Sequence, residues 1–231
     1  MSLASVYQAG SGCDAPAITL TQTRQPQIWN EHKGAECRFA RGETLFSEGD
    51  VADHHYRILS GAVRLFRMTS DGRRQITGFR LPGEILGFEW GDDCEVTAEA
   101  ASDVVAIRCS RVGFSRAIDE QSQVRNRVID LLRHELCAAQ AHLMILGRQS
   151  AEERVVSFLI DFAKRCHAGD GTPFDLYVTR EDMADYLGLT FETVSRTLSG
   201  LKRDGYIELP EARQVVIRRA NRLQDLVAEA S

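Results

Sequence analysis

Two absences limit the kind of protein that this 231-residue chain can be. No stretch of it approaches the roughly 18 consecutive apolar residues of a membrane-spanning helix. Its first residues, MSLASVYQAGSGCDAP, lack the basic segment and apolar run of a secretory signal peptide. We therefore expect a cytoplasmic protein with no membrane partner. Its 43% hydrophobic and 26% charged residues are typical of globular domains.

The cysteines and histidines also lack the spacing of a metal site. Six cysteines are spread along the chain with no Cys-x-x-Cys pair, which argues against a structural zinc site, an iron–sulfur cluster and a disulfide framework. His54 and His55 are adjacent and would point to opposite faces of a strand, whereas a cupin-type barrel enzyme needs two histidines separated by one residue. We expect neither a metal nor another cofactor, and a cupin-like enzyme is only a remote alternative.

Basic residues are in the minority, since 28 Lys and Arg stand against 33 Asp and Glu, giving a formal net charge of −5. This balance argues against a nonspecific nucleic-acid coat. It reverses locally, because the span from Arg196 to Arg222 holds seven basic residues against the three acidic residues Asp204, Glu208 and Glu211. Such a local excess could face a phosphate backbone, and scattered basic residues on a solvated surface are the alternative.

A short helix is predicted over Thr179 to Leu187. Thr179 can accept the backbone N–H of Asp182 and thereby begin the helix. One buried stripe is expected, formed by Met183, Ala184 and Leu187. Gly188 then supplies a turn, because glycine takes a left-handed backbone without penalty.

Thr190 is predicted to begin a second helix with two different faces. The apolar face consists of Val194, Leu198 and Leu201, and the polar face of Glu192, Ser195, Arg196 and Ser199. An arginine can pair with guanine and a glutamate can accept from cytosine, so Glu192 and Arg196 together could read a G·C pair in a major groove. The alternative is that they form only an i,i+4 ion pair in water.

The part of the chain before these helices predicts first strands and then a long helix. Short apolar runs separated by turn signals, including Asp71-Gly72, extend from Cys37 to Ser110 and indicate a sandwich or closed barrel. From about Arg116 to Leu146 apolar residues recur at steps of three and four. A helix of that length has more apolar surface than one small domain buries, so it is expected to meet a second copy, with packing against its own barrel as the alternative.

Several segments resemble the Crp/Fnr superfamily of transcription regulators. They are GETLFSEGD, ILSGAVRLF, DGRRQ, LPGEILGF, AEERVVSFLIDFAKR and YLGLTFETVSRTLSGLKRDGYI, which keeps the Glu-x-x-Ser-Arg arrangement of the FixK and Fnr branch. The resemblance implies an α+β fold with an N-terminal arm (residues 1–30), a jelly-roll, cyclic-nucleotide-binding-like β-barrel (31–115), a dimerisation helix (116–147) and a winged helix-turn-helix (148–231).

Residue by residue, the resemblance implies contacts to DNA and to a partner copy. The bases of a TTGA-type half-site would be contacted by Glu192, Ser195 and Arg196, and phosphates by Arg180, Thr190 and Thr193. Phe191 would either touch a thymine methyl or pack. The dimer helix would use Val124, Val128, Leu131, Leu132, Ala139, Leu143 and Leu146.

The resemblance also implies a function, a homodimeric activator that binds a pseudo-palindromic site, works with RNA polymerase and controls low-oxygen or nitrogen metabolism. Oxygen-sensing members carry several closely spaced N-terminal cysteines, but only Cys13 lies in that region here. Cyclic-nucleotide-binding members carry an Arg-Ser or Arg-Thr pair after a Gly-Glu; here Gly83 and Glu84 are followed by Cys94 and Glu95 at that place. We expect activity without a cyclic nucleotide, and a regulator that needs a ligand or haem is the alternative.

Overall fold

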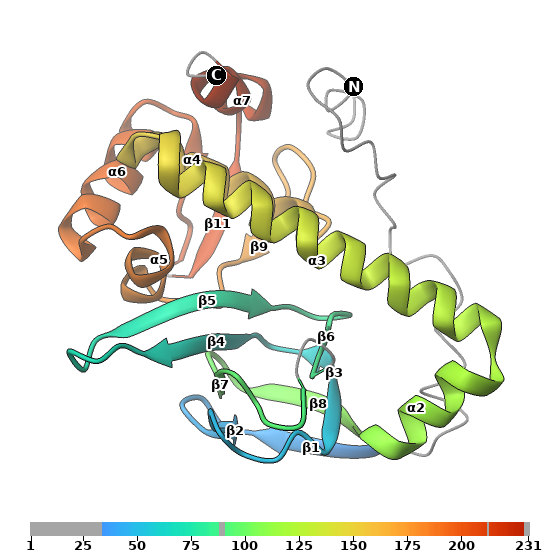
Figure 1. Ribbon diagram of the computed structural model, residues 1–231. Helices are drawn as coiled ribbons and strands as arrows, with labels where there is room; N and C mark the ends of the chain where they lie inside the picture. Colours follow the sequence, from blue (N-terminus) through green and yellow to red (C-terminus); the bar gives the residue numbers. More distant parts are fainter. Residues whose placement is uncertain (1–33, 88–90, 212, 229–231) are drawn as a thin grey trace. The chain divides into compact units, whose positions relative to one another are not determined.

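The computed structural model describes residues 34–87, 91–211 and 213–228 (Figure 1). The expected arm over residues 1–30 lies outside these ranges, as does Cys13. The described chain divides into two compact units that meet within one long helix, between Ala138 and Ala139. The first unit is built mainly from strands and the second mainly from helices, which confirms the predicted α+β class.

The first unit contains two antiparallel four-stranded sheets, in the orders β1-β8-β3-β6 and β2-β7-β4-β5. Their strands are β1 (Ala35–Phe39), β2 (Thr44–Phe46), β3 (His54–Ser60), β4 (Val63–Met68), β5 (Arg74–Arg80), β6 (Ile85–Leu86), β7 (Thr97–Ala100) and β8 (Val104–Ser110). Both sheets contribute alternate residues to one core, which includes Tyr56 and Ile58 from one sheet and Val63, Leu65 and Ala98 from the other. The two sheets thus enclose a shared apolar interior, as the strand pattern predicts.

Two glycine-containing turns join consecutive strands of this unit, and the first of them was predicted from the sequence. The predicted hairpin joins β4 to β5, where Gly72 has a φ of +77° and the N–H of Thr69 donates to the carbonyl of Arg73 over 2.8 Å. Between β5 and β6, Gly83 has a φ of +92° and the Glu84 carboxylate accepts the N–H of Leu81 over 2.9 Å. Glu84 therefore stabilises a turn.

The helical region differs from the single helix predicted over residues 116–147. It is divided into α2 (Arg111–Glu120) and α3 (Ser122–Arg148). Gln121 separates them with an extended backbone, φ −122° and ψ 106°, and its N–H caps α2 at the carbonyl of Ala117. Because the apolar spacing continues across this break, periodicity alone does not reveal it. Within the described ranges, no helix is both long and apolar enough to cross a membrane.

The second unit consists of the last turns of α3 and a helical domain with a small sheet. Its elements are α4 (Ala151–Arg165), β9 (Pro173–Asp175), α5 (Arg180–Leu187), α6 (Phe191–Arg203), β10 (Ile207–Glu208), β11 (Gln214–Ile217) and α7 (Ala220–Ala228). The three strands are antiparallel in the order β10-β11-β9. A capping box between Ser150 and Glu153 begins α4, whose Val155, Leu159 and Phe162 are almost fully buried. This core positions α5 and α6.

Candidate nucleic-acid interface

Helix α5 begins as the sequence predicts, with a reciprocal pair of hydrogen bonds. The Thr179 hydroxyl accepts the N–H of Asp182 over 3.1 Å, and the Asp182 carboxylate accepts the N–H of Thr179 over 2.9 Å. The second bond completes a capping box that the sequence reading did not include. Because Asp182 is fully buried and bonded in this way, the start of α5 is fixed, and with it the position of Arg180.

The turn between α5 and α6 is held from two sides. Gly188 has the predicted left-handed backbone, with φ +62° and ψ +41°, and its N–H donates to the carbonyl of Ala184. The Arg154 guanidinium, from the first turn of α4, donates to the carbonyls of Leu187 over 3.0 Å and Leu146 over 2.8 Å. These carbonyls lie in the last turns of α5 and α3, where a helix leaves them without intrahelical donors.

Helix α6 buries the apolar face that its sequence predicts. Val194, Leu198 and Leu201 are at most 2% exposed, and burying each is worth about 1.5–3 kcal/mol. The Thr190 hydroxyl caps the helix by accepting the N–H of Thr193 over 3.2 Å. Packing on one face therefore fixes which residues the opposite face presents to solvent.

The outward face of α6 carries Glu192 and Arg196, both exposed. Within the described ranges, these two side chains form no ion pair or hydrogen bond with each other or with another residue. Ser195 is half-buried, and its hydroxyl accepts a long hydrogen bond of 3.4 Å from the Arg180 guanidinium. The structure thus brings the predicted base-contact and phosphate-contact residues of α5 and α6 together at one surface.

The N-terminal end of α6 presents further hydrogen-bonding groups. The hydroxyls of Thr190 and Thr193 lie 3.1 Å apart and share one hydrogen bond, which leaves one hydroxyl proton for another acceptor. The first backbone N–H groups of the helix point out of the same end. Phe191 stands beside them with 46% of its surface exposed. A phosphate oxygen would meet several donors here.

The hairpin β10–β11 adds a basic residue that lies outside the helix-turn-helix motif. Arg213, just before β11, lines a groove of about 180 Å³ together with Arg180 and Leu198. Arg218 and Arg203 are neutralised by Glu208 and Asp204 over 2.7 and 3.1 Å, and the Arg218 hydrogen bond lowers the pKa of Glu208. In the described part of the chain, several other basic residues make no ion pair, namely Arg196, Lys202, Arg213, Arg219 and Arg222. The basic span identified from the sequence would have been the signal for Arg213.

The apolar residues of α3 belong to two separate rows. Val124 is 4% exposed and packs with Phe114 and Ala117, and Val128 packs against the same cluster. A second row is exposed, with Ile129 at 48%, Leu132 at 42%, Leu136 at 60% and Leu143 at 68%; Ala139 is exposed as well. Of the predicted dimer residues, Val124 is therefore unavailable to a partner, Leu131 and Leu146 are half-buried, and Leu132, Ala139 and Leu143 remain accessible.

The segment that the resemblance places at the Arg-Ser pair of cyclic-nucleotide-binding members, Cys94 and Glu95, has acidic surroundings in the first unit. Cys94 is buried, and the burial raises the pKa of its thiol. The nearby carboxylates of Asp50, Asp53 and Asp93 raise this pKa further, and the Arg111 guanidinium, which donates to the carbonyl of Ala52, opposes them. The N–H of Cys94 donates to the carbonyl of Asp50 over 2.8 Å, so this segment is held beside the acidic turn. Negative charge at this place would repel an anionic phosphate.

Two family models match the two halves of the chain. Residues 36–121 match the cyclic nucleotide-binding domain, and residues 153–226 match the Crp-like helix-turn-helix domain.

Several similar proteins match most of the chain. The nitrogen fixation regulation protein FixK of Azorhizobium caulinodans is 42% identical over 216 residues, covering 92% of this chain and 87% of that protein. The transcriptional activatory protein AadR of Rhodopseudomonas palustris is 40% identical over 179 residues, 77% of this chain and 75% of its own. The structure of FixK2 from Bradyrhizobium japonicum has a TM-score of 0.80 at 38% identity and covers 86% of this chain and 99% of that one.

Proposed function

The chain belongs to the Crp/Fnr family of transcription regulators, and from that premise we propose that it binds a TTGA-type inverted repeat as a homodimer and activates transcription there. Relatives are named for nitrogen fixation regulation and transcriptional activation. We extend that role to this chain as control of nitrogen or low-oxygen metabolism, exerted together with RNA polymerase.

One observation supports this proposal above all. Among the described residues, Glu192 and Arg196 are exposed and unpaired on one face of α6, and the opposite face of the helix is buried. In the described structure they form no ion pair with each other, so neither charge is neutralised by the other. A guanidinium can donate twice to guanine, and a carboxylate one turn away can accept from the paired cytosine. Ser195 lies between them and adds a third polar group for a neighbouring base.

Contacts to the DNA backbone would fix the position of this helix in the groove. The hydroxyls of Thr190 and Thr193 and the first N–H groups of α6 suit one phosphate, because charge-assisted bonds to a helix N-terminus favour an anion. Arg180 would meet a phosphate from the adjoining end of α5. Phe191 is exposed at the same end and could contact a thymine methyl. Such backbone contacts position the protein without selecting a sequence.

A homodimer would supply a second copy of α6 for the second half-site of the DNA. The exposed row of α3 offers leucines at Leu132, Leu136 and Leu143 and an isoleucine at Ile129, spaced by three, four and seven residues. That spacing is typical of a helix that packs against a copy of itself. A two-fold dimer would present two copies of α6 to half-sites about one helical turn, roughly 10 bp, apart.

We further propose that binding needs no cyclic nucleotide. A cyclic phosphate would meet the carboxylates around Cys94 and no arginine of the family's phosphate-binding pair at that place. The regulator would then be controlled through its own synthesis or by oxidation of a thiol outside α6, because no cysteine follows Cys166.

The test is fluorescence anisotropy of the purified full chain, without added ligand, on a TTGA inverted repeat and on a scrambled duplex. We expect clear preference for the repeat, with an affinity that falls steeply with salt. Arg196→Ala should cost about 1–3 kcal/mol per half-site and relax base choice, whereas Arg180→Ala should weaken both duplexes alike. Arg203→Ala is the matched control on α6, because Asp204 already neutralises Arg203.

Two results would overturn parts of this proposal. Equal affinity for both duplexes rejects the sequence-specific role of Glu192, Ser195 and Arg196. Binding that appears only after a ligand is added, or a haem band in the visible spectrum of the purified protein, rejects activity without an effector and favours a ligand-sensing regulator.

A further inference from the structure

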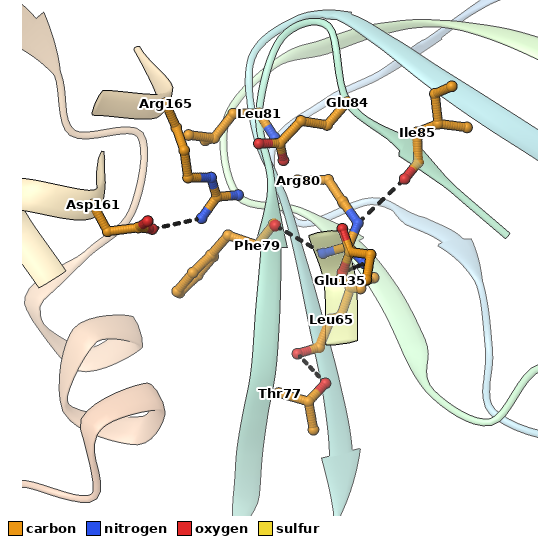
Figure 2. Close-up of polar contacts among 10 residues, drawn as sticks. All are labelled: Leu65, Thr77, Phe79, Arg80, Leu81, Glu84, Ile85, Glu135, Asp161 and Arg165. Carbon is orange, nitrogen blue, oxygen red and sulfur yellow. Dashed lines mark hydrogen bonds and ion pairs between the residues drawn. The ribbon is translucent and has the colours of Figure 1, made fainter. Parts of the chain in front are cut away.

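Arg80, at the end of β5, joins three segments of the first unit through one buried guanidinium (Figure 2). Its Nη1 donates to the carbonyl of Phe79 over 3.1 Å, its Nε to the carbonyl of Ile85 in β6 over 3.2 Å, and its Nη2 to the carboxylate of Glu135 in α3 over 2.9 Å. The Arg80 side chain is 9% exposed and that of Glu135 45%. The bonds to Phe79 and Ile85 hold the guanidinium to the strands of the first unit, and the bond to Glu135 reaches the helix.

Glu135 continues the barrel-facing row of α3. At about 100° per residue, Val124, Val128, Leu131 and Glu135 fall within a narrow sector of the helix, and the exposed row of Ile129, Leu132, Leu136 and Leu143 is centred about a quarter turn away. The burial agrees, because Val124 and Val128 pack against an apolar cluster that also contains Ile85. The apolar contact and the ion pair therefore hold the same face of α3 at two points, about two to three turns apart.

We propose that the Arg80–Glu135 ion pair is a positioning contact that sets the rotation of α3 on the barrel, so that the exposed row faces a second copy without a bound effector. This inference rests on the homodimer of the proposed function. If only Val124 and Val128 packed there, α3 would be anchored to the first unit only near the N-terminal end of the helix. The ion pair adds a second anchor next to Leu132 and Leu136, where a small rotation would move those side chains out of register with the partner.

The chemistry of the pair suits this task. The arginine guanidinium is planar, and its N–H groups point in fixed directions. Hydrogen bonds from two of its nitrogens to carbonyls of the first unit therefore fix the direction of the N–H groups on the third nitrogen. The low exposure of Arg80 reduces solvent screening on its side of the bond, whereas a fully exposed pair would contribute little.

Glu135→Gln is the informative variant, because the amide keeps the length and one acceptor but removes the charge. Asp130→Asn is a matched control on the same helix, since Asp130 has a side-chain exposure of 44% and faces Arg133 over 3.8 Å. By sedimentation equilibrium of the full chain, we expect Glu135→Gln to raise the dimer dissociation constant roughly tenfold and Glu135→Ala to raise it further. Asp130→Asn should change it less than about twofold.

Disulfide cross-linking distinguishes a change in rotation from a general loss of stability. In a Cys137→Ser background, Leu136→Cys should cross-link two copies rapidly under oxidation, and His134→Cys, on the opposite side of α3, should not. Adding Glu135→Gln should slow the Leu136→Cys reaction several-fold at temperatures where circular dichroism shows the fold intact.

The inference is overturned if the wild-type chain is a DNA-binding dimer and Glu135→Gln changes neither the dissociation constant nor the cross-linking rate. It is also overturned if Asp130→Asn has the same effect as Glu135→Gln. A wild-type chain that stays monomeric on DNA rejects the proposed homodimer itself, which is a different result.

Discussion

Replacing Arg154 should destabilise the helical unit more than any other single arginine substitution near it. The Arg154 guanidinium donates to the carbonyls of Gln149, Leu187 and Leu146 over 3.0, 3.0 and 2.8 Å. It therefore ties the ends of α3 and α5 to the start of α4. Arg154→Met keeps the apolar stem and removes all three bonds.

The size of the effect follows from those three bonds. A hydrogen bond from a charged donor is worth about 1.5–3 kcal/mol when buried, but Arg154 is half-buried and water can replace part of each bond. About 1 kcal/mol per bond gives a loss of about 3 kcal/mol. For a unit of roughly 90 residues, this corresponds to a midpoint lowered by roughly 10–20 °C. Arg154→Lys should lose about half as much, because an ammonium cannot span all three carbonyls.

The assay is thermal unfolding of the full chain, followed by circular dichroism, together with amide hydrogen exchange of α5. Arg148→Met is the control, since Arg148 is exposed in the last turn of α3 and contributes at most the interaction with the helix dipole, about 0.5 kcal/mol. If Arg154→Met and Arg148→Met lower the midpoint equally, the three carbonyl bonds do not stabilise the unit as argued.

Substitutions at three further positions test local features. Gly188→Ala should cost about 1 kcal/mol, because a Cβ there meets only ordinary contacts and the cost is that of a left-handed backbone; Gly188→Asn should recover part of it in thermal unfolding. Burial raises the pKa of the Cys109 thiol from 9.0 to about 11, so the unfolded chain loses this proton first as the pH rises. The free energy of unfolding should therefore fall by up to about 2 kcal/mol between those pH values. Urea titrations of the Cys109→Ala variant should not show that fall. Burial lowers the pKa of His142, which stacks on Tyr186 with ring centroids 4.0 Å apart, against the opposing effects of Asp161 and a backbone bond at Tyr186. Because the unfolded chain binds this proton first, stability should decrease as the pH falls below 6.5, and His142→Phe should flatten that decrease in the same titration.

Local signals in the sequence were enough to predict the two helices of the helix-turn-helix. Thr179 and Thr190 cap them, Gly188 takes the left-handed turn, and Val194 and Leu198 are buried as their spacing indicates. Each of these features depends on residues within one or two turns of each other. The resemblance to Crp/Fnr regulators, to which the same segment contributes, is confirmed by the family models and the relatives.

Features that depend on distant residues were not predictable in this way. Arg80 and Glu135 are 55 positions apart, and nothing in the surroundings of either residue indicates the other. The apolar spacing from Val124 to Leu146 predicts one face of a helix, but the structure divides these residues between two faces. A helix with apolar residues at steps of three and four can bury one sector and expose the neighbouring one. Only the three-dimensional fold separates the row that packs on the barrel from the row left for a partner.

Strand β11 lies at the centre of the small sheet, with β9 from before the helix-turn-helix on one side and β10 from after it on the other. The stretch of chain that contains α5 and α6 is therefore closed into a loop by its own ends. Truncating the protein ahead of Gln214 would remove the backbone partners of both outer strands at once. A shortened helix-turn-helix domain that omits the β10–β11 hairpin should therefore fail to fold.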